Sequence, residues 1–299
     1  MNNKIASLIL ALFCCSWLPS PAESAEAASQ FVRFVPGEAQ WQGELQTAII
    51  SYENEAGVEL DLVAAVHIAD DAYYAALNRY FSSRDAVLYE LVANPEDRPS
   101  PRLNSATGRG SALGFVQQAL AGFLGVGFQL EHIDYSAANF VHADMTPAQL
   151  QETMQAKNEN FLSMFLNLAL AQLAAEQLAA SNGGNSVDNS SGSTLTTLSL
   201  MSALLAEDRG TAIKYIVAQE LGRSGGTSLT AAMEDQLTIL GDRNKIALAV
   251  LAESLANPAL SHISLFFGAA HMPGIEREII ATLGFRKREQ VWMSAWIIP

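Results

Sequence analysis

Two segments of the chain share one layout: an apolar run, then small residues, then a histidine. The first is "DLVAAVHIADD" (61–71), which reaches His67, and the second is "SLFFGAAHMPG" (264–274), which reaches His271. Continuous apolar runs of this length are typical of strands buried on both faces of a parallel sheet. The pattern therefore predicts an α/β fold in which two buried strands each end at a histidine.

Each of these strands is followed by a helical pattern and then by another strand. After His67, "DAYYAALNRYFS" (71–82) has helical spacing with Asp70 or Asp71 as its cap, and "DAVLYELV" reads as a buried strand that contains Glu90. After His271, "PGIEREIIATLGF" predicts a helix that ends at Gly284, and "QVWMSAWII" predicts a last strand. The order strand, helix, strand is typical of a parallel βαβ unit.

The two units correspond in register along the chain. His271 follows His67 by 204 positions, and Ser294 follows Glu90 by the same number. We interpret residues 58–92 and 262–298 as two related βαβ-type halves of one mixed sheet, an α/β (α+β) fold within a single domain over 28–299. Residues 44–67 predict a hairpin that turns at "NEAG".

A mainly helical insert is expected over 112–256. Helical patterns cover about 112–124, 147–180, 195–221 and 229–256, and "SNGGNSVDNSSGS" (181–193) has the composition of a flexible loop. Thr146 is the expected cap of the second helix, with Pro147 in its first turn.

Residues 1–27 have the three parts of a signal peptide: a short basic start, an apolar stretch and a small-residue zone. Cleavage after Ala22, Ala25 or Ala27 satisfies the small-x-small rule. The apolar stretch is shorter than the roughly 20 residues of a membrane span, and it contains both cysteines, Cys14 and Cys15. We therefore expect a secreted or periplasmic protein without disulfides and without stable membrane insertion after cleavage.

The net charge of −14 disfavours a nucleic-acid partner, because such a surface has no excess of cations to neutralise phosphates. A peptide or a small molecule is the expected substrate.

His67, Glu90 and His271 are the candidate site residues. Ligand sites of parallel α/β sheets form beyond the carboxyl ends of the strands, where both histidines are expected. A carboxylate in an apolar strand is costly unless it is paired or ligating, and two histidines with a carboxylate are a common hydrolytic metal set. In the alternative interpretation each histidine is structural, and Glu90 pairs with an arginine such as Arg84.

The remaining motifs have simpler interpretations. His132 and His142 are expected to orient loops, and His262 is expected at the surface because it opens a strand. The turn "LGDRN" around Arg243 reads by default as a capped helix start after Gly241.

These motifs together resemble the TraB/PrgY/GumN family, which is related to the TIKI proteases and to erythromycin-esterase-like and ChaN-like proteins. Its mark is two Gly-x-x-His motifs, a glutamate after the first and an Arg-containing turn before the second. The second motif is intact at Gly268–His271, whereas the first has Ala64 in place of glycine. Glu90 corresponds to the glutamate and Arg243 to the arginine of the turn.

The resemblance implies converging histidines and a metal-dependent, peptidase-like hydrolase, with manganese or cobalt as the divalent metal in preference to zinc. His67, Glu90 and His271 would be ligands, with Glu90 alternatively the general base. Arg243 would bind a substrate carboxylate or stabilise an oxyanion.

Two other functions stay open at this point. The second is a periplasmic binding protein that sequesters a peptide or haem, which Ala64 favours because it crowds the approach to a metal. The third is a metal-free, esterase-like site in which His67 and Glu90 perform acid–base chemistry.

Overall fold

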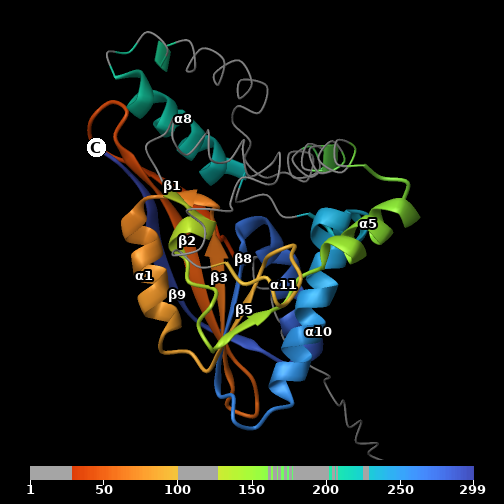
Figure 1. Ribbon diagram of the computed structural model, residues 1–299. Helices are drawn as coiled ribbons and strands as arrows, with labels where there is room; N and C mark the ends of the chain where they lie inside the picture. Colours follow the sequence, from red (N-terminus) through yellow and green to blue (C-terminus); the bar gives the residue numbers. More distant parts are fainter. Residues whose placement is uncertain are drawn as a thin grey trace, which may run out of the picture.

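The computed structural model describes residues 29–99, 127–160, 208–224 and 229–299, together with scattered residues between 163 and 206. The predicted signal peptide, the 112–124 helix and the 181–193 loop lie outside these residues. Figure 1 shows a central sheet with helices on both of its faces.

The sheet has seven strands and is mixed, in the order β1-β2-β3-β8-β5-β7, with β9 on the other edge of β2. This confirms the predicted α/β class with a mixed sheet. Its strands are β1 (Val32–Pro36), β2 (Gly43–Glu53), β3 (Glu59–Ala65), β5 (Ala86–Tyr89), β7 (Phe140–His142), β8 (His262–Gly268) and β9 (Arg286–Ile298). A separate two-stranded sheet pairs β4 (Ile68–Ala69) with β6 (Gly127–Phe128).

Four neighbouring strands, β3, β8, β5 and β7, run parallel. Their carboxyl ends therefore meet at one edge of the molecule. The predicted hairpin is confirmed, because β2 pairs antiparallel with β3. Its turn places Gly57 at a φ of 78°, a backbone conformation that a glycine adopts without strain.

The two faces of the sheet are covered by different helices, as Figure 1 shows. Helix α1 (Asp71–Phe81) packs on one face, where Tyr74 and Leu77 join a buried apolar cluster with Val63 and Val87. Helices α10 (Arg243–Leu255) and α11 (Met272–Leu283) cover the other. Both central apolar runs are thereby buried on two sides, as their composition predicted.

The second βαβ unit departs from the first at its last strand. Strand β9 runs beside β2, so that β2 and β3 separate it from β8, whereas β5 lies directly beside β8. Ser294 on β9 therefore does not occupy a place like that of Glu90, and its hydroxyl donates to Glu44 instead. Helix α11 ends at Gly284 as predicted, with a φ of 69°.

The capping predictions are confirmed in one case and wrong in another. Thr146 and Gln149 form a reciprocal capping box at the start of α5 (Pro147–Ala156). Asp70 precedes α1 but makes no cap bond. Its carboxylate accepts from Lys214 and from the backbone of Ile297, which connects α1 to α8 (Arg209–Ser224) and to β9.

The helical insert is more broken than the periodicity indicated. The pattern over 229–256 forms α9 (Ala231–Asp235), a π-helical turn (Thr238–Asp242) and α10. The break occurs at Gly241, where a Cβ would lie 2.3 Å from the carbonyl oxygen of Glu234. Helix α5 likewise ends at Ala156, ahead of Asn158 with its φ of 53°. Among the described residues no helix is both long and apolar enough to cross a membrane.

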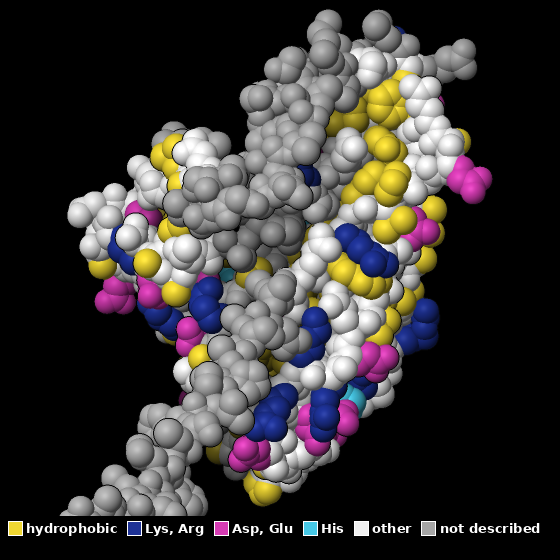
Figure 2. Space-filling model, turned by 180° about the vertical axis from the view of Figure 1, so that it is seen from behind, with side chains coloured by type: hydrophobic (Ala, Val, Ile, Leu, Met, Phe, Trp, Pro, Cys, Tyr) yellow, Lys and Arg dark blue, Asp and Glu magenta, His cyan; other side chains and the backbone are white. Residues whose placement is uncertain are grey.

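The surface mixes charges of both signs. On the face that Figure 2 shows, Lys and Arg side chains lie beside Asp and Glu side chains, with hydrophobic side chains between them. Arg288 with Glu53 is one of the surface ion pairs.

Candidate functional site

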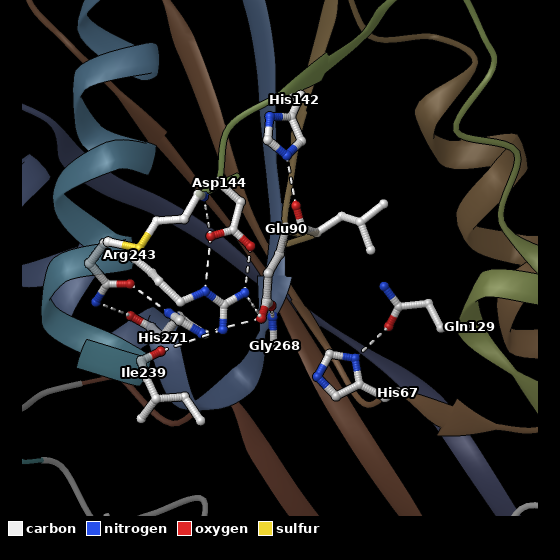
Figure 3. Close-up of polar contacts among 12 residues, drawn as sticks. His67, Glu90, Gln129, His142, Asp144, Ile239, Arg243, Gly268 and His271 are labelled. Carbon is white, nitrogen blue, oxygen red and sulfur yellow. Dashed lines mark hydrogen bonds and ion pairs between the residues drawn. The ribbon is translucent and has the colours of Figure 1, made fainter. Parts of the chain in front are cut away.

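Three of the predicted site residues follow three adjacent parallel strands. His67 comes after β3, His271 after β8 and Glu90 after β5, in the order in which these strands lie in the sheet. Glu90 lies one residue beyond β5, so its prediction as a residue within the strand was wrong by one position. Figure 3 shows the three side chains at this edge, together with Arg243 from the start of α10.

The Glu90 carboxylate is held by nitrogen donors on both oxygens. Arg243 Nη2 lies 2.7 Å from Oε1, and the backbone N–H of Gly268 donates to Oε2 over 2.5 Å. His271 Nε2 lies 3.3 Å from Oε1. Burial opposes the charge, but the cationic groups of His271 and Arg243 outweigh it and hold the pKa of Glu90 well below its usual value.

Arg243 connects Glu90 to a second buried carboxylate, Asp144. Its Nε and Nη2 donate to the two oxygens of Asp144 over 2.9 and 2.5 Å, and Nη1 points at the carbonyl of Ile239. Burial disfavours the charged guanidinium, but the charge of Glu90 and the bonds to Asp144 raise its pKa further above the usual value. With these donors engaged inside the protein, Arg243 is arranged to hold Glu90 more than to bind a substrate carboxylate.

Asp144 is a site residue that the sequence analysis missed. It follows β7, which is parallel to β5, in the apolar stretch "FVHADM". Glu90 was identified as a carboxylate within an apolar stretch, and Asp144 carries a comparable signal because it lies between Ala143 and Met145.

His271 is held from behind by an amide. Its Nδ1 lies 2.6 Å from Asn244 Oδ1, and Asn244 Nδ2 donates to Glu234 Oε1 over 2.5 Å and to the carbonyl of His271. Carboxylate and carbonyl oxygens only accept, so the amide NH₂ must face them and the amide oxygen must face the imidazole. Nδ1 of His271 therefore carries a proton.

The carboxylate of Glu234 packs against Gly274, a position where no larger residue would fit. A Cβ on Gly274 in the first turn of α11 would lie 1.8 Å from Glu234 Oε1. Arg277 Nη2 donates to the other oxygen of Glu234 over 2.7 Å. The glycine in "HMPG" thus makes space for the carboxylate that orients Asn244.

His67 has a similar support on the other side of the site. Its Nδ1 lies 3.1 Å from Gln129 Oε1, and Gln129 Nε2 donates to the hydroxyl of Tyr135. With the amide oxygen facing it, Nδ1 of His67 carries a proton, and Nε2 is the ring nitrogen left for the site. His67 is exposed, whereas His271 is buried, so the site opens towards solvent at His67.

Gly268 leaves the space between Glu90 and His67. A Cβ at this position would lie 3.1 Å from Glu90 Oε2 and 3.4 Å from His67 Nε2. Ala64, the residue that departs from the family pattern, packs instead in the apolar cluster on the α11 side of the sheet. The alanine methyl group is thereby accommodated in the core.

The short distance between Nε2 of His271 and Oε1 of Glu90 has a chemical consequence. Because Nδ1 of His271 donates to Asn244, an unprotonated Nε2 would set a lone pair against Glu90 Oε1 at 3.3 Å. Such an arrangement is favourable only when a positive species lies between the two atoms, either a proton on Nε2 or a bound cation. The site is therefore arranged to hold one of these.

The donor set fits a divalent metal ion in part. Each imidazole has an oxygen atom at its Nδ1, as metal-binding histidines commonly do, and the Glu90 carboxylate lies 3.3 Å from His271 Nε2. However, Glu90 already accepts from Arg243 and Gly268. In the described ranges no group of three or more His, Cys, Asp and Glu side chains is close enough to hold a metal ion as it stands. A metal would thus need the three side chains to draw together.

The other histidines have structural contacts. His142 Nε2 contacts the carbonyl of Leu91, and His132 stacks on Tyr74, as expected for residues that orient loops. His262 is partly exposed and contacts Glu59 and Asp61.

The alternative interpretation of Glu90, a strand-end carboxylate that pairs with an arginine, is confirmed with Arg243 as the partner, whereas Arg84 pairs with Asp61. This pair and His262 line a groove of about 420 Å³ at the opposite end of the parallel strands from the candidate site.

Comparisons of the chain with family models, with curated proteins and with solved structures returned no match. The family resemblance therefore stays a prediction that the motifs alone support.

Proposed function

We propose that the chain is an exported hydrolase, peptidase-like in its substrate class, whose active site consists of His67, Glu90 and His271. The observation that carries the proposal is the pair formed by His271 Nε2 and Glu90 Oε1 at 3.3 Å, with Nδ1 of His271 already bound to Asn244. A divalent cation held between this base and this carboxylate would polarise a bound carbonyl group.

A divalent metal ion would be held by Nε2 of His67, Nε2 of His271 and the carboxylate of Glu90. Manganese or cobalt is the preferred ion, on the resemblance alone. When bound, such an ion polarises a carbonyl group and lowers the pKa of a water molecule. Gln129 and Asn244 keep both Nε2 atoms directed at the site, and such supporting contacts tune metal affinity about 10–100-fold.

Arg243 and Glu90 have complementary roles in this proposal. Arg243 keeps Glu90 ionised, so that its carboxylate serves as a ligand or accepts a proton from water. Because Asp144 also holds the guanidinium, we assign Arg243 to positioning Glu90.

Metal content, measured by mass spectrometry after reconstitution with manganese, cobalt or zinc, tests the proposal. We expect about one equivalent in the wild type, and loss of the metal in His67→Ala and in His271→Ala. His142→Ala is the matched control, because His142 contacts a carbonyl outside the site. Peptide hydrolysis is then assayed on the same four proteins, and activity that persists in either site variant would refute the proposal.

A metal-free hydrolase is the second candidate, and one observation favours it. The Glu90 oxygens already accept from Arg243 and Gly268, and a doubly protonated His271 completes that set without any metal. In that case His67 and Glu90 perform the acid–base steps. Hydrolysis that survives a chelator supports this candidate, whereas peptide or haem binding without turnover supports a sequestering protein.

A further inference from the structure

The groove at the end of the sheet remote from His67 has an apolar half and an acidic half. It is lined by residues of α1, β2, β3 and β9, and its volume of about 420 Å³ is within the roughly 300–1,000 Å³ typical of small-molecule pockets. The apolar half is formed by Ile49 of β2, by Val291 and Met293 of β9, and by Tyr80 of α1. Val291 is 48% exposed, so an apolar surface faces water in this groove.

The pairing of β2 with both of its neighbours sets the polarity of the groove. Side chains directly opposite each other on adjacent strands point to the same face of a sheet. Ile49 lies opposite Val291, which gives the apolar half. Two residues further along β2, Ser51 lies opposite Glu289 of β9 and opposite Asp61 of β3. The floor therefore changes from aliphatic to carboxylate within one step of the side-chain period.

The acidic half has more carboxylates than cations. Its carboxylates are those of Glu53, Glu59, Asp61 and Glu289, and its arginines are Arg84 and Arg288. Asp61 pairs with Arg84, Glu53 pairs with Arg288, and Glu59 contacts His262. The groove therefore favours a cationic ligand over an anionic one.

Glu289 is the carboxylate that is available to a ligand. It is exposed, and no cationic side chain of the described ranges pairs with it, since the two arginines of β9, Arg286 and Arg288, contact Glu55 and Glu53. Glu289 and Val291 are two residues apart on one strand and both line the groove, so the carboxylate lies directly beside the exposed apolar side chain. A ligand that joins a cation to an apolar body matches this arrangement.

We propose that the groove binds a small organic cation with an apolar body. The ammonium group pairs with Glu289, and the body packs on Val291, Ile49 and the ring of Tyr80. Such packing removes the exposed part of Val291 from water, which is favourable. The groove lies at the opposite end of the parallel strands from His67, so this binding site does not depend on the proposed hydrolase.

Three probes that share one apolar body and differ in charge test the proposal: phenylbutylamine, phenylbutanol and phenylbutyrate. Isothermal titration calorimetry on the wild-type protein at pH 7 measures the three dissociation constants. From the strength of an exposed ion pair, we expect the amine to bind about fivefold more tightly than the alcohol. The acid should bind more weakly than either, because the carboxylates of the groove repel it.

Three variants locate the ligand in the groove. Glu289→Gln removes one charge and should make the amine bind about as weakly as the alcohol, with the affinity for the alcohol unchanged. Val291→Ser should weaken the amine and the alcohol alike, by about threefold, because both lose apolar contact. Glu253→Gln is the matched control, because it removes an exposed carboxylate from α10, outside the groove, and should retain all three affinities. The substituted side chains are exposed, so these variants are expected to fold.

Equal affinities for the three probes, or no binding of the amine at millimolar concentrations, would overturn the proposal. A preference for the amine that survives Glu289→Gln, or that is lost in Glu253→Gln, would mean that the cation is held elsewhere and would overturn it as well. A preference lost only in Glu289→Gln, with both affinities reduced in Val291→Ser, supports a cation site in the groove.

Discussion

Arg243 is the cation that two buried carboxylates share, and Arg243→Met removes it while keeping much of the apolar volume of the side chain. The side chains of Arg243, Glu90 and Asp144 are 10%, 9% and 0% exposed. Removal of one partner from a buried ion pair costs about 3–5 kcal/mol, because it leaves an uncompensated charge. Since two carboxylates lose their partner here, we expect the upper part of that range at pH 7.

The difference in unfolding free energy between the wild type and Arg243→Met should become smaller as the pH falls. In the wild type the pKa of Glu90 is lowered, so its ionised form stabilises the fold above the unfolded value of about 4.3, and this contribution is lost as the pH falls through the folded value. In Arg243→Met the guanidinium no longer opposes the effect of burial, and the pKa of Glu90 rises. The variant then takes up a proton at higher pH, and its deficit at pH 5 is smaller than at pH 7.

Urea unfolding of both proteins at pH 7 and pH 5 measures this. With an m-value of about 3 kcal/mol/M, the midpoint at pH 7 should fall by roughly 1–2 M. Arg84→Met is the matched control, because it breaks the buried pair with Asp61 at the other end of the strands. It should lower stability while leaving metal content unchanged. A shift below about 0.3 M for Arg243→Met would refute the reasoning.

Three smaller changes test other parts of the structure. Gly268→Ala places a Cβ 3.1 Å from Glu90 Oε2, at a backbone conformation (φ −54°, ψ 141°) that any residue can adopt. We expect it to displace the Glu90 carboxylate and to weaken metal binding about tenfold in titrations. Thr146→Ala removes the capping box and should lower the free energy of unfolding in urea by about 1 kcal/mol. Thr146→Ser keeps the hydroxyl and should keep most of that stability. Gly284→Ala, at a φ of 69°, should lower the free energy of unfolding by about 1 kcal/mol. An unchanged urea midpoint would contradict the left-handed conformation of this helix cap.

The central strands of the sheet were predictable because their signals are local, whereas the place of β9 beside β2 was not. Continuous apolar runs such as 62–66 and 265–270 identify strands buried on both faces, and the following helical patterns identify α1 and α11. The helical breaks were not predictable from periodicity. The π-helical turn depends on the close approach of Gly241 to the backbone of Glu234, which is a contact between elements.

The same distinction applies to the site. The strand-end positions of His67 and His271 follow from their own segments, but their supports come from elsewhere. Gln129 is 62 residues from His67 and is brought to it by the backbone bond from Gln129 N to the carbonyl of His67 and by the β4–β6 pair. An amide side chain carries no sequence signal for such a role.

The start of α10 shows how one short segment serves both sides of the candidate site. Arg243 reaches Glu90, and the next residue, Asn244, reaches His271, so adjacent positions hold the two partners of the 3.3 Å pair. The resemblance predicted only the arginine of this turn. Because Glu234 and Gly274 fix Asn244 in turn, the orientation of His271 depends on α9 and α11 as well. The geometry of the candidate site is therefore determined by how the helices pack on the sheet, a level that the separate motifs do not encode.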